Sequence, residues 1–386
     1  MKNIIIFGVT GSIGRSTLDI IRAQKNRFKI LGLTAKSQVK VLRKLAEEFK
    51  PSYLVIEKEA DAEYLKRSLS YSPEILWGDE GLKRLALLPS ADLVVIGISG
   101  IKGLIPTYYA LKSGKKVAIA NKESLIVAGK LLKKIAKENQ GELIPVDSEH
   151  SALFQLLQKE EYSKIEKLYL TASGGPFYDM PVDKFSKITP EMAINHPTWK
   201  MGAKISIDSA TLMNKGFEVL EASVLFDFPI EKIKVLIHPQ SIVHALIKLI
   251  DGSYLAHLSI PDMKIPISYA LNFPERIKIP IKELELEEIG TLVFKKPDFQ
   301  KFPCLKIAYE VGKMGDPYPL ILEAADEVVV DAFMKKKITF DKIPFFIEKT
   351  LKDFKMDLKN FKNIEEILFL HKEICFFTQK LIEERY

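Results

Sequence analysis

The chain has 386 residues, 47% of them hydrophobic and 28% charged, so it can bury a large core and is expected to form two or three domains. Its net charge of +7 comes from lysines spread along the sequence. That charge is weak evidence for nucleic acid and equally suits an anionic, phosphorylated small substrate. No stretch approaches the roughly 20 apolar residues of a membrane span, and the apolar run at residues 4–7 is too short for a signal peptide. We expect a cytoplasmic protein without nucleic-acid or membrane partners.

Residues 1–146 alternate short β-branched runs with amphipathic stretches, and few hairpin signals interrupt them. Strand, helix, strand repetition favours parallel pairing through right-handed crossovers. This region is therefore predicted to be a Rossmann-like, doubly wound parallel sheet of the α/β class. The expected strands are residues 4–7, 28–34, 53–56, 93–96, 117–120 and 143–146, and helical patterns cover 39–49 and 131–138.

Gly8, Gly11 and Gly14 directly follow the first expected strand and open the helical run at residues 16–21. Backbone amides and the positive end of a helix then converge on one point, which suits a pyrophosphate. The spacing is GxxGxxG, and its place at the first strand-to-helix turn supplies the specificity. A plain tight turn is the alternative.

The end of the second strand indicates which dinucleotide is bound. Folds that prefer NAD usually place an Asp or Glu there for the ribose 2′-hydroxyl. Here Lys36, Ser37 and Gln38 follow the strand instead, and each can donate to a 2′-phosphate. NADPH is therefore the expected cofactor, with ordinary solvated loop polarity as the alternative.

Two further polar clusters follow expected strands, at residues 121–124 and 147–151. The first places Asn, Lys, Glu and Ser where open parallel sheets bind ligands, although it can also simply begin a helix. In the second, Asp147 and Glu149 can converge on one hard cation, and oxygen ligands without cysteine favour Mg²⁺ or Mn²⁺. His150 is more often a neighbour than a ligand. A helix N-cap with acids in its first turn is the alternative.

From residue 147 the sequence pattern is typical of an α+β domain. A hairpin is indicated where Asp251-Gly252 separates the apolar runs 242–249 and 254–259. Residues 147–282 are expected to form the catalytic, metal- and substrate-binding domain, residues 283–299 a linker, and residues 300–386 a helical bundle. Helical periodicity covers residues 320–334, 343–354 and 364–382. The aromatic residues of this region are expected in the core; they include Phe345, Phe346, Phe376 and Phe377.

Residues 171–176 and 195–218 combine small, polar and aromatic side chains at a density that is costly in a purely structural segment. The first of these segments can bind an anion or form a structural turn. Trp199 is expected on a loop that closes over a ligand, with a surface loop packed on the core as the alternative. Ser209, Asn214 and Lys215 supply hydrogen-bond donors for a phosphate monoester. Glu218 can provide a third carboxylate ligand for the metal.

Cys304 and Cys375 lie far apart and without CxxC spacing. We expect neither a disulfide framework nor a thiolate zinc site, and expect both residues to be small buried hydrophobes.

With these motifs the chain resembles one family over its whole length, 1-deoxy-D-xylulose 5-phosphate reductoisomerase. The motifs that carry the resemblance are Gly8-Val-Thr-Gly-Ser-Ile-Gly14, Asn121-Lys-Glu-Ser124, Val146-Asp-Ser-Glu-His150, Asn195-His-Pro-Thr-Trp199, Lys204-Ile-Ser-Ile-Asp-Ser-Ala210, Asn214-Lys-Gly216, His238-Pro-Gln-Ser241 and Pro261-Asp-Met263. The resemblance implies that a homodimeric enzyme converts this sugar phosphate to 2-C-methyl-D-erythritol 4-phosphate. A metal-assisted retro-aldol and aldol rearrangement is followed by hydride transfer from NADPH, on the methylerythritol phosphate route to isoprenoids.

The resemblance also assigns roles to residues. It makes Asp147, Glu149 and Glu218 the ligands of Mg²⁺ or Mn²⁺, with Lys122 and His196 as further catalytic groups. Besides these groups, the residues assigned to the substrate are Ser148, Ser173, Ser209, Asn214, Lys215, Trp199 and Met201, the last two in a mobile lid. The residues assigned to NADPH are Thr10, Gly11, Ser12, Ile13, Lys36, Ser37, Gln38, Asn121, Glu123 and Gly202.

Three positions depart from the family's common pattern: Ala172 replaces a Gly, Asp326 replaces an Asn, and Lys36-Ser37-Gln38 differs from the commoner Gly-Lys-Asn type. None is an assigned metal ligand, but the last alters the expected 2′-phosphate contacts. The alternative functions are an NADP-dependent dehydrogenase of another small phosphorylated substrate and a non-catalytic NADPH-binding protein. The first would need no metal site with three carboxylates.

Overall fold

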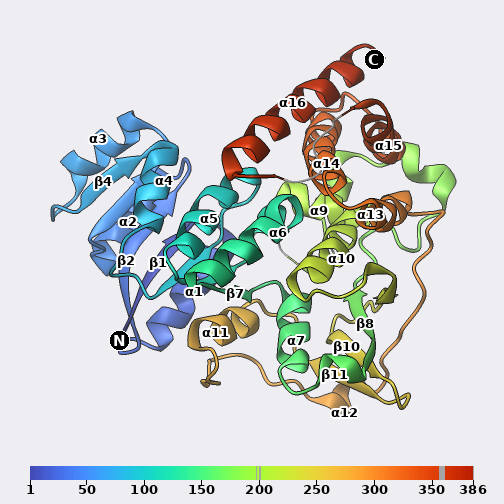
Figure 1. Cartoon of the computed structure of the whole chain (residues 1–386), viewed down its shortest axis with the longest axis horizontal. Helices are drawn as coiled ribbons and strands as arrows, with labels where there is room; N and C mark the ends of the chain where they lie inside the picture. The colour runs from blue at the N-terminus through green and yellow to red at the C-terminus, as the bar shows by residue number, and fades with distance from the viewer. Residues whose placement is uncertain (197, 200, 356–360, 386) are drawn as a thin grey trace. The chain divides into compact units, whose positions relative to one another are not determined.

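The computed structural model describes residues 1–196, 198–199, 201–355 and 361–385 (Figure 1). The chain divides into two compact units. The first comprises Met1–Ser124, Lys130–Ser151 and Asp262–Lys282, and the second comprises Leu125–Gly129, Ala152–Pro261 and Glu283–Tyr386. The domain boundaries expected from the sequence stay a prediction. Among the described helices, none combines the length and the apolar character that crossing a membrane requires.

The first unit contains a seven-stranded parallel sheet in the order β4-β3-β2-β1-β5-β6-β7. Residues 4–7 of β1 are fully buried, as expected for a parallel strand covered on both faces. The strand order reverses between β1 and β5, and ligands bind beyond the strand ends at such a point. The expected Rossmann-like sheet is confirmed. Its strands are β1 (Lys2–Phe7), β2 (Phe28–Ala35), β3 (Tyr53–Ile56), β4 (Glu74–Trp77), β5 (Leu93–Ile96), β6 (Lys116–Ile119) and β7 (Glu142–Pro145).

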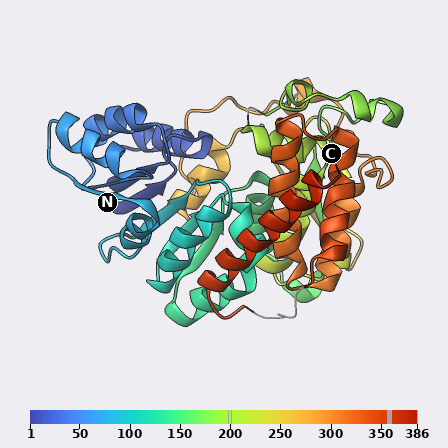
Figure 2. The same ribbon diagram turned by 90° about the horizontal axis from the view of Figure 1, so that it is seen from above.

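Helices cover both faces of this sheet (Figure 2). On one face α1 packs against α11, which also contacts β6 and β7, and on the other face α4 packs against α5. The helices that lie wholly or partly in this unit are α1 (Ser12–Ala23), α2 (Val39–Phe49), α3 (Glu59–Ser68), α4 (Gly78–Ala86), η1 (Ile101–Gly103), α5 (Leu104–Lys112), α6 (Lys122–Asn139), α7 (Ser148–Leu157) and α11 (Lys264–Asn272).

One strand of the sheet, β4, was not expected from the sequence. It is an edge strand in which only Ile75 is buried, while Glu74 and Trp77 are exposed. Four residues with a single buried side chain produce neither an apolar run nor a clear alternation. The other six strands lie within a few residues of their expected positions.

The second unit is built on a four-stranded mixed sheet in the order β11-β10-β8-β9. β10 pairs antiparallel with both β8 and β11, and β8 pairs parallel with β9. The hairpin expected around Asp251-Gly252 is therefore confirmed. The strands are β8 (Ile165–Ala172), β9 (Ile233–Ile237), β10 (Val243–Leu249) and β11 (Tyr254–Leu258).

Helix α10 packs on β8 and β9, and α13 packs on α10, so a continuous hydrophobic core joins the sheet to the C-terminal helices. The expected C-terminal helices are confirmed, but the expected aromatic core is only partly right. Phe346 is fully buried, whereas Phe345 and Phe376 are 41% and 70% exposed. The helices and 3₁₀ turns of this unit are η2 (Tyr162–Lys164), η3 (Val182–Lys187), α8 (Pro190–Ala193), α9 (Ala203–Ala210), α10 (Met213–Leu225), η4 (Ile230–Lys232), α12 (Leu286–Ile289), α13 (Pro303–Met314), α14 (Tyr318–Met334), η5 (Phe340–Lys342), α15 (Ile343–Asp353) and α16 (Ile364–Glu383).

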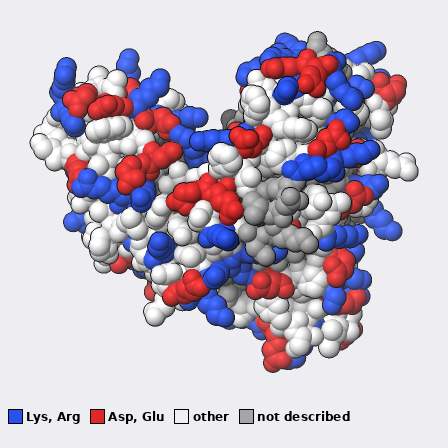
Figure 3. Space-filling model, turned by 45° about the horizontal axis from the view of Figure 1, so that its top comes forward, with Lys and Arg blue, Asp and Glu red and all other residues white. Residues whose placement is uncertain are grey.

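Charged side chains of both signs are intermingled on the surface. On the face drawn in Figure 3, Lys and Arg side chains lie among Asp and Glu side chains. The lysines behind the net charge of +7 are spread along the sequence, and on this face they lie beside acidic side chains.

Candidate active site

Glycines shape the turn between β1 and α1. Gly8 has a φ of +81°, and a Cβ on it would lie 2.7 Å from the backbone of Gly97, which follows β5. A Cβ on Gly14 would lie 2.4 Å from Cα of Val9. A side chain at Gly8 would force the turn away from the sheet, and a side chain at Gly14 would force α1 away from the turn. Gly11 precedes α1 without a side-chain cap, which leaves the first turn of the helix suited to an anion.

The end of β2 is tied to the same turn. The amide of Gly8 donates to Oγ1 of Thr34 at 2.9 Å, and the amide of Val9 donates to the carbonyl of Thr34 at 2.9 Å. Lys36, Ser37 and Gln38 follow directly after β2 and are exposed. The structure thus brings the glycine turn and the donor-rich loop to adjacent strand ends of the first unit.

Asn121 and Glu123 hold the loop that follows β5. Asn121 caps α6 by accepting from the amide of Ser124 at 3.0 Å, so the helix-start interpretation of this motif is confirmed. Its Nδ2 also donates to the carbonyls of Ile98 and Gly100, each at 3.0 Å, and Glu123 accepts from the amide of Gly100 at 2.8 Å. Both residues therefore position backbone beside the strand ends, and their contact with NADPH stays a prediction.

Asp147, between β7 and α7, gathers several hydrogen-bond donors. Its Oδ2 accepts from the ammonium group of Lys122, and its Oδ1 accepts from the amide of Glu149 at 3.2 Å and faces Nδ1 of His150 at 3.1 Å. Oγ of Ser148 donates to Oε2 of Glu149 at 2.7 Å. The side chains of Lys122 and Asp147 are each only 12% exposed, which strengthens their attraction. The first unit thus brings together four of the expected site residues and places His150 beside them.

His196 and Ser173 form a pair in the second unit. Nδ1 of His196 accepts from the amides of Thr198 and Trp199, at 3.1 and 3.0 Å. A nitrogen that faces two N–H groups must carry the lone pair, so the ring proton lies on Nε2, 3.0 Å from Oγ of Ser173. Burial lowers the pKa of His196, which also favours the neutral ring. Because Ser173 accepts from His196 and from the amide of Gly175 at 3.2 Å, its own hydrogen can point to a ligand.

Asn214, Lys215 and Glu218 share the first turns of α10. Nδ2 of Asn214 donates to Oε1 of Glu218 at 2.7 Å, and the ammonium group of Lys215 donates to the other carboxylate oxygen. Their helical spacing of three and four residues makes these contacts possible. The side chains of Lys215 and Glu218 are only 5% and 2% exposed, so this is a nearly dry charge pair with a neutral donor beside it.

The remaining expected residues lie on the segments around α9. Gly175 lies so close to Ser209 that a Cβ on it would be 2.7 Å from the Ser209 carbonyl oxygen. Trp199 and Met201 are partly buried, and Gly202 is exposed at the start of α9. Pro197 and Lys200, which are close in sequence to Trp199 and Met201 on the loop expected to close over a ligand, are outside the described residues.

Three family models match this chain. The 1-deoxy-D-xylulose 5-phosphate reductoisomerase model matches residues 4–129, the model of that enzyme's C-terminal domain matches residues 143–226, and the DXP reductoisomerase C-terminal domain model matches residues 258–375. The chain belongs to the 1-deoxy-D-xylulose 5-phosphate reductoisomerase family. The 1-deoxy-D-xylulose 5-phosphate reductoisomerase of Clostridium perfringens is 46% identical over the whole of both chains. The enzyme of Prosthecochloris aestuarii is 48% identical over 91% of this chain and 92% of its own length.

Solved reductoisomerase structures have the same fold. A DOX-P reductoisomerase in complex with NADPH, fosmidomycin and magnesium is 40% identical, covers 99% of this chain and 98% of its own, and gives a TM-score of 0.95. The Zymomonas mobilis enzyme in complex with NADPH is 38% identical, covers 99% of each chain and gives a TM-score of 0.93.

Sequence reasoning missed one buried charge network of this chain. Nζ of Lys204 contacts Asp208 at 2.7 Å and Asp326 at 2.6 Å. Burial, and then the negative charge of Asp326, raise the pKa of Asp208 well above its ordinary value, and burial raises the pKa of Asp326. Two buried carboxyl groups beside one ammonium group therefore retain a proton. The available signal was Asp326 in place of the family's common Asn.

Proposed function

We propose that this chain converts 1-deoxy-D-xylulose 5-phosphate to 2-C-methyl-D-erythritol 4-phosphate. The chain is an NADPH- and divalent-metal-dependent oxidoreductase that acts on a sugar phosphate, in non-mevalonate isoprenoid biosynthesis. Membership of the family over the full length of the chain is the observation that carries this function.

Asp147, Glu149 and Glu218 are proposed to hold Mg²⁺ or Mn²⁺. The three carboxylates are a ligand set that one metal ion can share, and oxygen-only ligands fit these hard cations. The ammonium groups of Lys122 and Lys215 already pair with Asp147 and Glu218, so a bound metal ion would share these carboxylates with them or displace them. When bound, the ion supplies Lewis-acid polarisation of the substrate's carbonyl and adjacent hydroxyl oxygens.

The phosphate group of the substrate is assigned to donors of the second unit. Ser173 offers its hydroxyl hydrogen, and Lys215 contributes a positive charge that suits a phosphate oxygen. Neutral His196 fixes the orientation of Ser173 rather than adding charge. The full proposed set is Ser173, His196, Ser209, Asn214 and Lys215, and Trp199 with Met201 would close over the bound substrate.

NADPH is assigned to the first unit, and the residues present fit it. Gly8 and Gly14 let the turn pack closely on the strand ends and on α1, because a Cβ at either position would collide with backbone. The uncapped first turn of α1 then offers backbone amides to a pyrophosphate. The proposed contacts in this unit are Thr10, Gly11, Ser12, Ile13, Asn121 and Glu123, with Lys36, Ser37 and Gln38 for the 2′-phosphate. Gly202, which belongs to the second unit, is a further proposed contact. When bound, NADPH supplies the hydride that reduces the rearranged aldehyde.

The side chains around Asp147 have proposed roles in the rearrangement. Lys122 donates to a substrate oxygen and stabilises negative charge there as the carbon–carbon bond breaks. Glu149 holds the proton that a substrate hydroxyl releases in the retro-aldol step and returns it when the new bond forms. Ser148, bonded to Glu149 at 2.7 Å, orients that carboxylate and contacts a substrate hydroxyl.

A product assay separates this function from its rivals. The purified chain should convert 1-deoxy-D-xylulose 5-phosphate and NADPH to the branched erythritol phosphate, identified by NMR, and only with a divalent metal ion present. A dehydrogenase of another phosphorylated substrate would leave the carbon skeleton unchanged, and a non-catalytic NADPH-binding protein would form no product.

A homodimer is the proposed assembly. β11 is the edge strand of the second sheet, and Tyr254, Leu255 and Leu258 on it are all at least one-third exposed. An edge strand with exposed apolar side chains is suited to pairing with a second copy. Light scattering should give twice the chain mass, and a Leu255→Lys variant should shift it toward the monomer. A cytoplasmic location is proposed as well, and cell fractionation tests it.

A further inference from the structure

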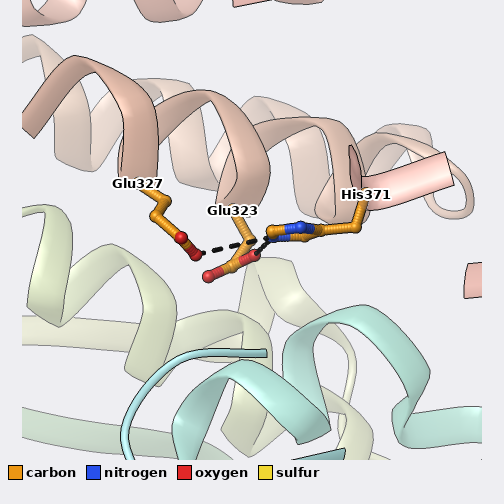
Figure 4. A group of neighbouring side chains, drawn as sticks. All are labelled: Glu323, Glu327 and His371. Carbon is orange, nitrogen blue, oxygen red and sulfur yellow. Dashed lines mark hydrogen bonds and ion pairs between the residues drawn. The ribbon is translucent and has the colours of Figure 1, made fainter. Parts of the chain in front are cut away.

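A group of three ionisable side chains joins two C-terminal helices and takes no part in the proposed reaction. Glu323 and Glu327 lie one turn apart on α14, and His371 lies on α16. Figure 4 shows the two carboxylates and the imidazole ring pointing toward one another. We propose that Glu323, Glu327 and His371 form a second divalent-metal site, for a transition-metal ion such as Zn²⁺, that ties α16 to α14.

The distances among the three side chains suit one shared ion. Nε2 of His371 lies 2.7 Å from Oε2 of Glu323 and 3.7 Å from Oε2 of Glu327. One ligand atom from each residue lies within 4.8 Å of the other two. The spacing of four residues on α14 presents both carboxylates on one face, so a small rotamer adjustment can place three ligands around an ion.

A buried oxygen of Glu323 points to a missing partner. The side chain of Glu323 is fully buried, and its Oε1 has no hydrogen-bond partner among the described residues. An unsatisfied buried acceptor of this kind destabilises the folded chain, and more so when it is charged. A cation between the helices would remove this destabilisation, because it would coordinate the carboxylate directly.

The surroundings of His371 favour coordination through Nε2. Its other nitrogen, Nδ1, faces Sγ of Cys375 at 3.6 Å, and Cys375 lies one turn further along α16. In a metal-bound histidine, the nitrogen that does not bind the metal normally bonds to a neighbouring group, which fixes the orientation of the ring. Cys375 can act in this way at Nδ1, and Nε2 then faces the metal. Cys375 therefore supports the ring and is not itself a proposed ligand.

The charge and atom types of the three side chains indicate which metal ion the site would bind. Without an ion, burial disfavours the charged ring, but the contact with Glu323 helps to raise the pKa of His371 to about 10 and so favours the protonated ring. A bound ion would displace that proton, and two carboxylates with a neutral imidazole would then carry two negative charges, which one divalent cation neutralises within a largely buried site. One nitrogen and two oxygen ligands suit Zn²⁺ or Co²⁺ better than Mg²⁺, which prefers oxygen alone. The side chain of Glu327 is 42% exposed, so an ion and a completing water molecule can enter from that side.

Metal content of the full-length chain tests the site. The Glu218→Gln background weakens the proposed active-site metal, so Co²⁺ binding can be followed there by its visible absorption and by metal analysis after dialysis. We expect about one Co²⁺ per chain, displaced by Zn²⁺, and Zn²⁺ should raise the melting temperature. Absence of bound Co²⁺ in this background would overturn the proposal, whatever the activity of the wild-type enzyme.

Ligand variants then assign the ion to these residues. Glu327→Gln leaves the buried Glu323–His371 contact intact, so the fold should persist, while Co²⁺ affinity should fall about 10-fold or more. His371→Gln should abolish the absorption. Glu373→Gln removes an exposed carboxylate from the same helix and should change neither. Equal Co²⁺ affinity in the Glu327→Gln and Glu373→Gln variants would contradict the site and leave a buried imidazolium–carboxylate pair as the role of His371.

Discussion

Nε2 of His196 donates to Oγ of Ser173 across 3.0 Å, because two backbone amides occupy Nδ1 on the other side of the ring. The relationship gives both residues one function, since the histidine fixes where the serine hydroxyl hydrogen can point. In the proposed phosphate site, this hydrogen is the group that reaches the substrate.

Replacing His196 by Gln should therefore weaken binding of the phosphorylated substrate. Without this histidine the Ser173 hydroxyl loses its orientation and its hydrogen bond to the phosphate, a bond to a charged group worth about 1.5–3 kcal/mol. KM should therefore rise on the order of 10–100-fold while the affinity for NADPH changes little. Steady-state kinetics with each substrate varied in turn give both values. Ser173→Ala and the double variant complete a cycle, and strictly additive losses would show that the two residues act separately.

Lys36→Asp should reverse the cofactor preference in part. The variant replaces a cation that faces the proposed 2′-phosphate with an anion, so affinity for NADPH should fall at least about 10-fold while affinity for NADH stays within a few-fold. Fluorescence titration measures both. Lys40→Asp, an exposed change on α2 just beyond this loop, is the control for general charge effects. A similar loss of NADPH affinity in both variants would argue against a specific 2′-phosphate contact.

Gly14→Ala should damage the dinucleotide site more than Gly11→Ala. The new methyl group at position 14 would lie 2.4 Å from Cα of Val9, whereas at position 11 its nearest contact is an ordinary 3.4 Å from the Gly8 carbonyl oxygen. We expect a lower melting temperature and much weaker NADPH binding only for the first variant. Thermal unfolding with and without NADPH tests this, and equal behaviour would contradict the close packing of α1 on the turn.

Asp326→Asn should stabilise the protein at neutral and higher pH. The raised pKa values of Asp208 and Asp326 mean that the folded state retains protons which the unfolded state has released, so stability falls as pH rises above about 4. The variant leaves Asp208 paired with Lys204, and the free energy of unfolding near pH 8 should rise by on the order of 1 kcal/mol.

Urea unfolding of wild type and Asp326→Asn from pH 4 to pH 8 measures this difference. Asp331→Asn, an exposed change on the same helix, should alter stability by less than about 0.5 kcal/mol at every pH. A fall in stability for Asp326→Asn at pH 8 would show that the Asp326–Lys204 ion pair outweighs the repulsion between the carboxylates.

Local pattern was enough to predict most of the first sheet, because a strand such as β1 is buried on both faces and appears as an unbroken apolar run. It failed for β4, where one buried residue among four leaves no period. The hairpin at Asp251-Gly252 was also predictable, since the turn type requires these residues. Exposure of Phe345 and Phe376 was not, because aromatic residues at helical spacing do not reveal which face meets a partner element.

Site residues also differ in whether a local sequence pattern could predict them. Residues next to strand ends, such as Asp147 and Glu149, could be proposed because the topology of a parallel sheet places them there. The contact between Lys204 and Asp326 joins positions 122 residues apart, and no local pattern reports it. His371 and Cys375 show a different failure, since their four-residue spacing was present but neither the thiol nor the imidazole indicated a role until α14 placed Glu323 beside them.

Asp147, Glu149 and Glu218 are the proposed metal ligands, and a metal held by them would distinguish this chain from a simple dehydrogenase. The most direct measurement is NADPH oxidation with 1-deoxy-D-xylulose 5-phosphate, after chelation and again with Mg²⁺ added back, in the wild type and in Glu218→Gln. Chelation should abolish wild-type turnover, Mg²⁺ should restore it, and the variant should stay at least about 100-fold slower while circular dichroism shows an unchanged fold. Full turnover without a divalent metal, or wild-type rates in Glu218→Gln, would contradict the account.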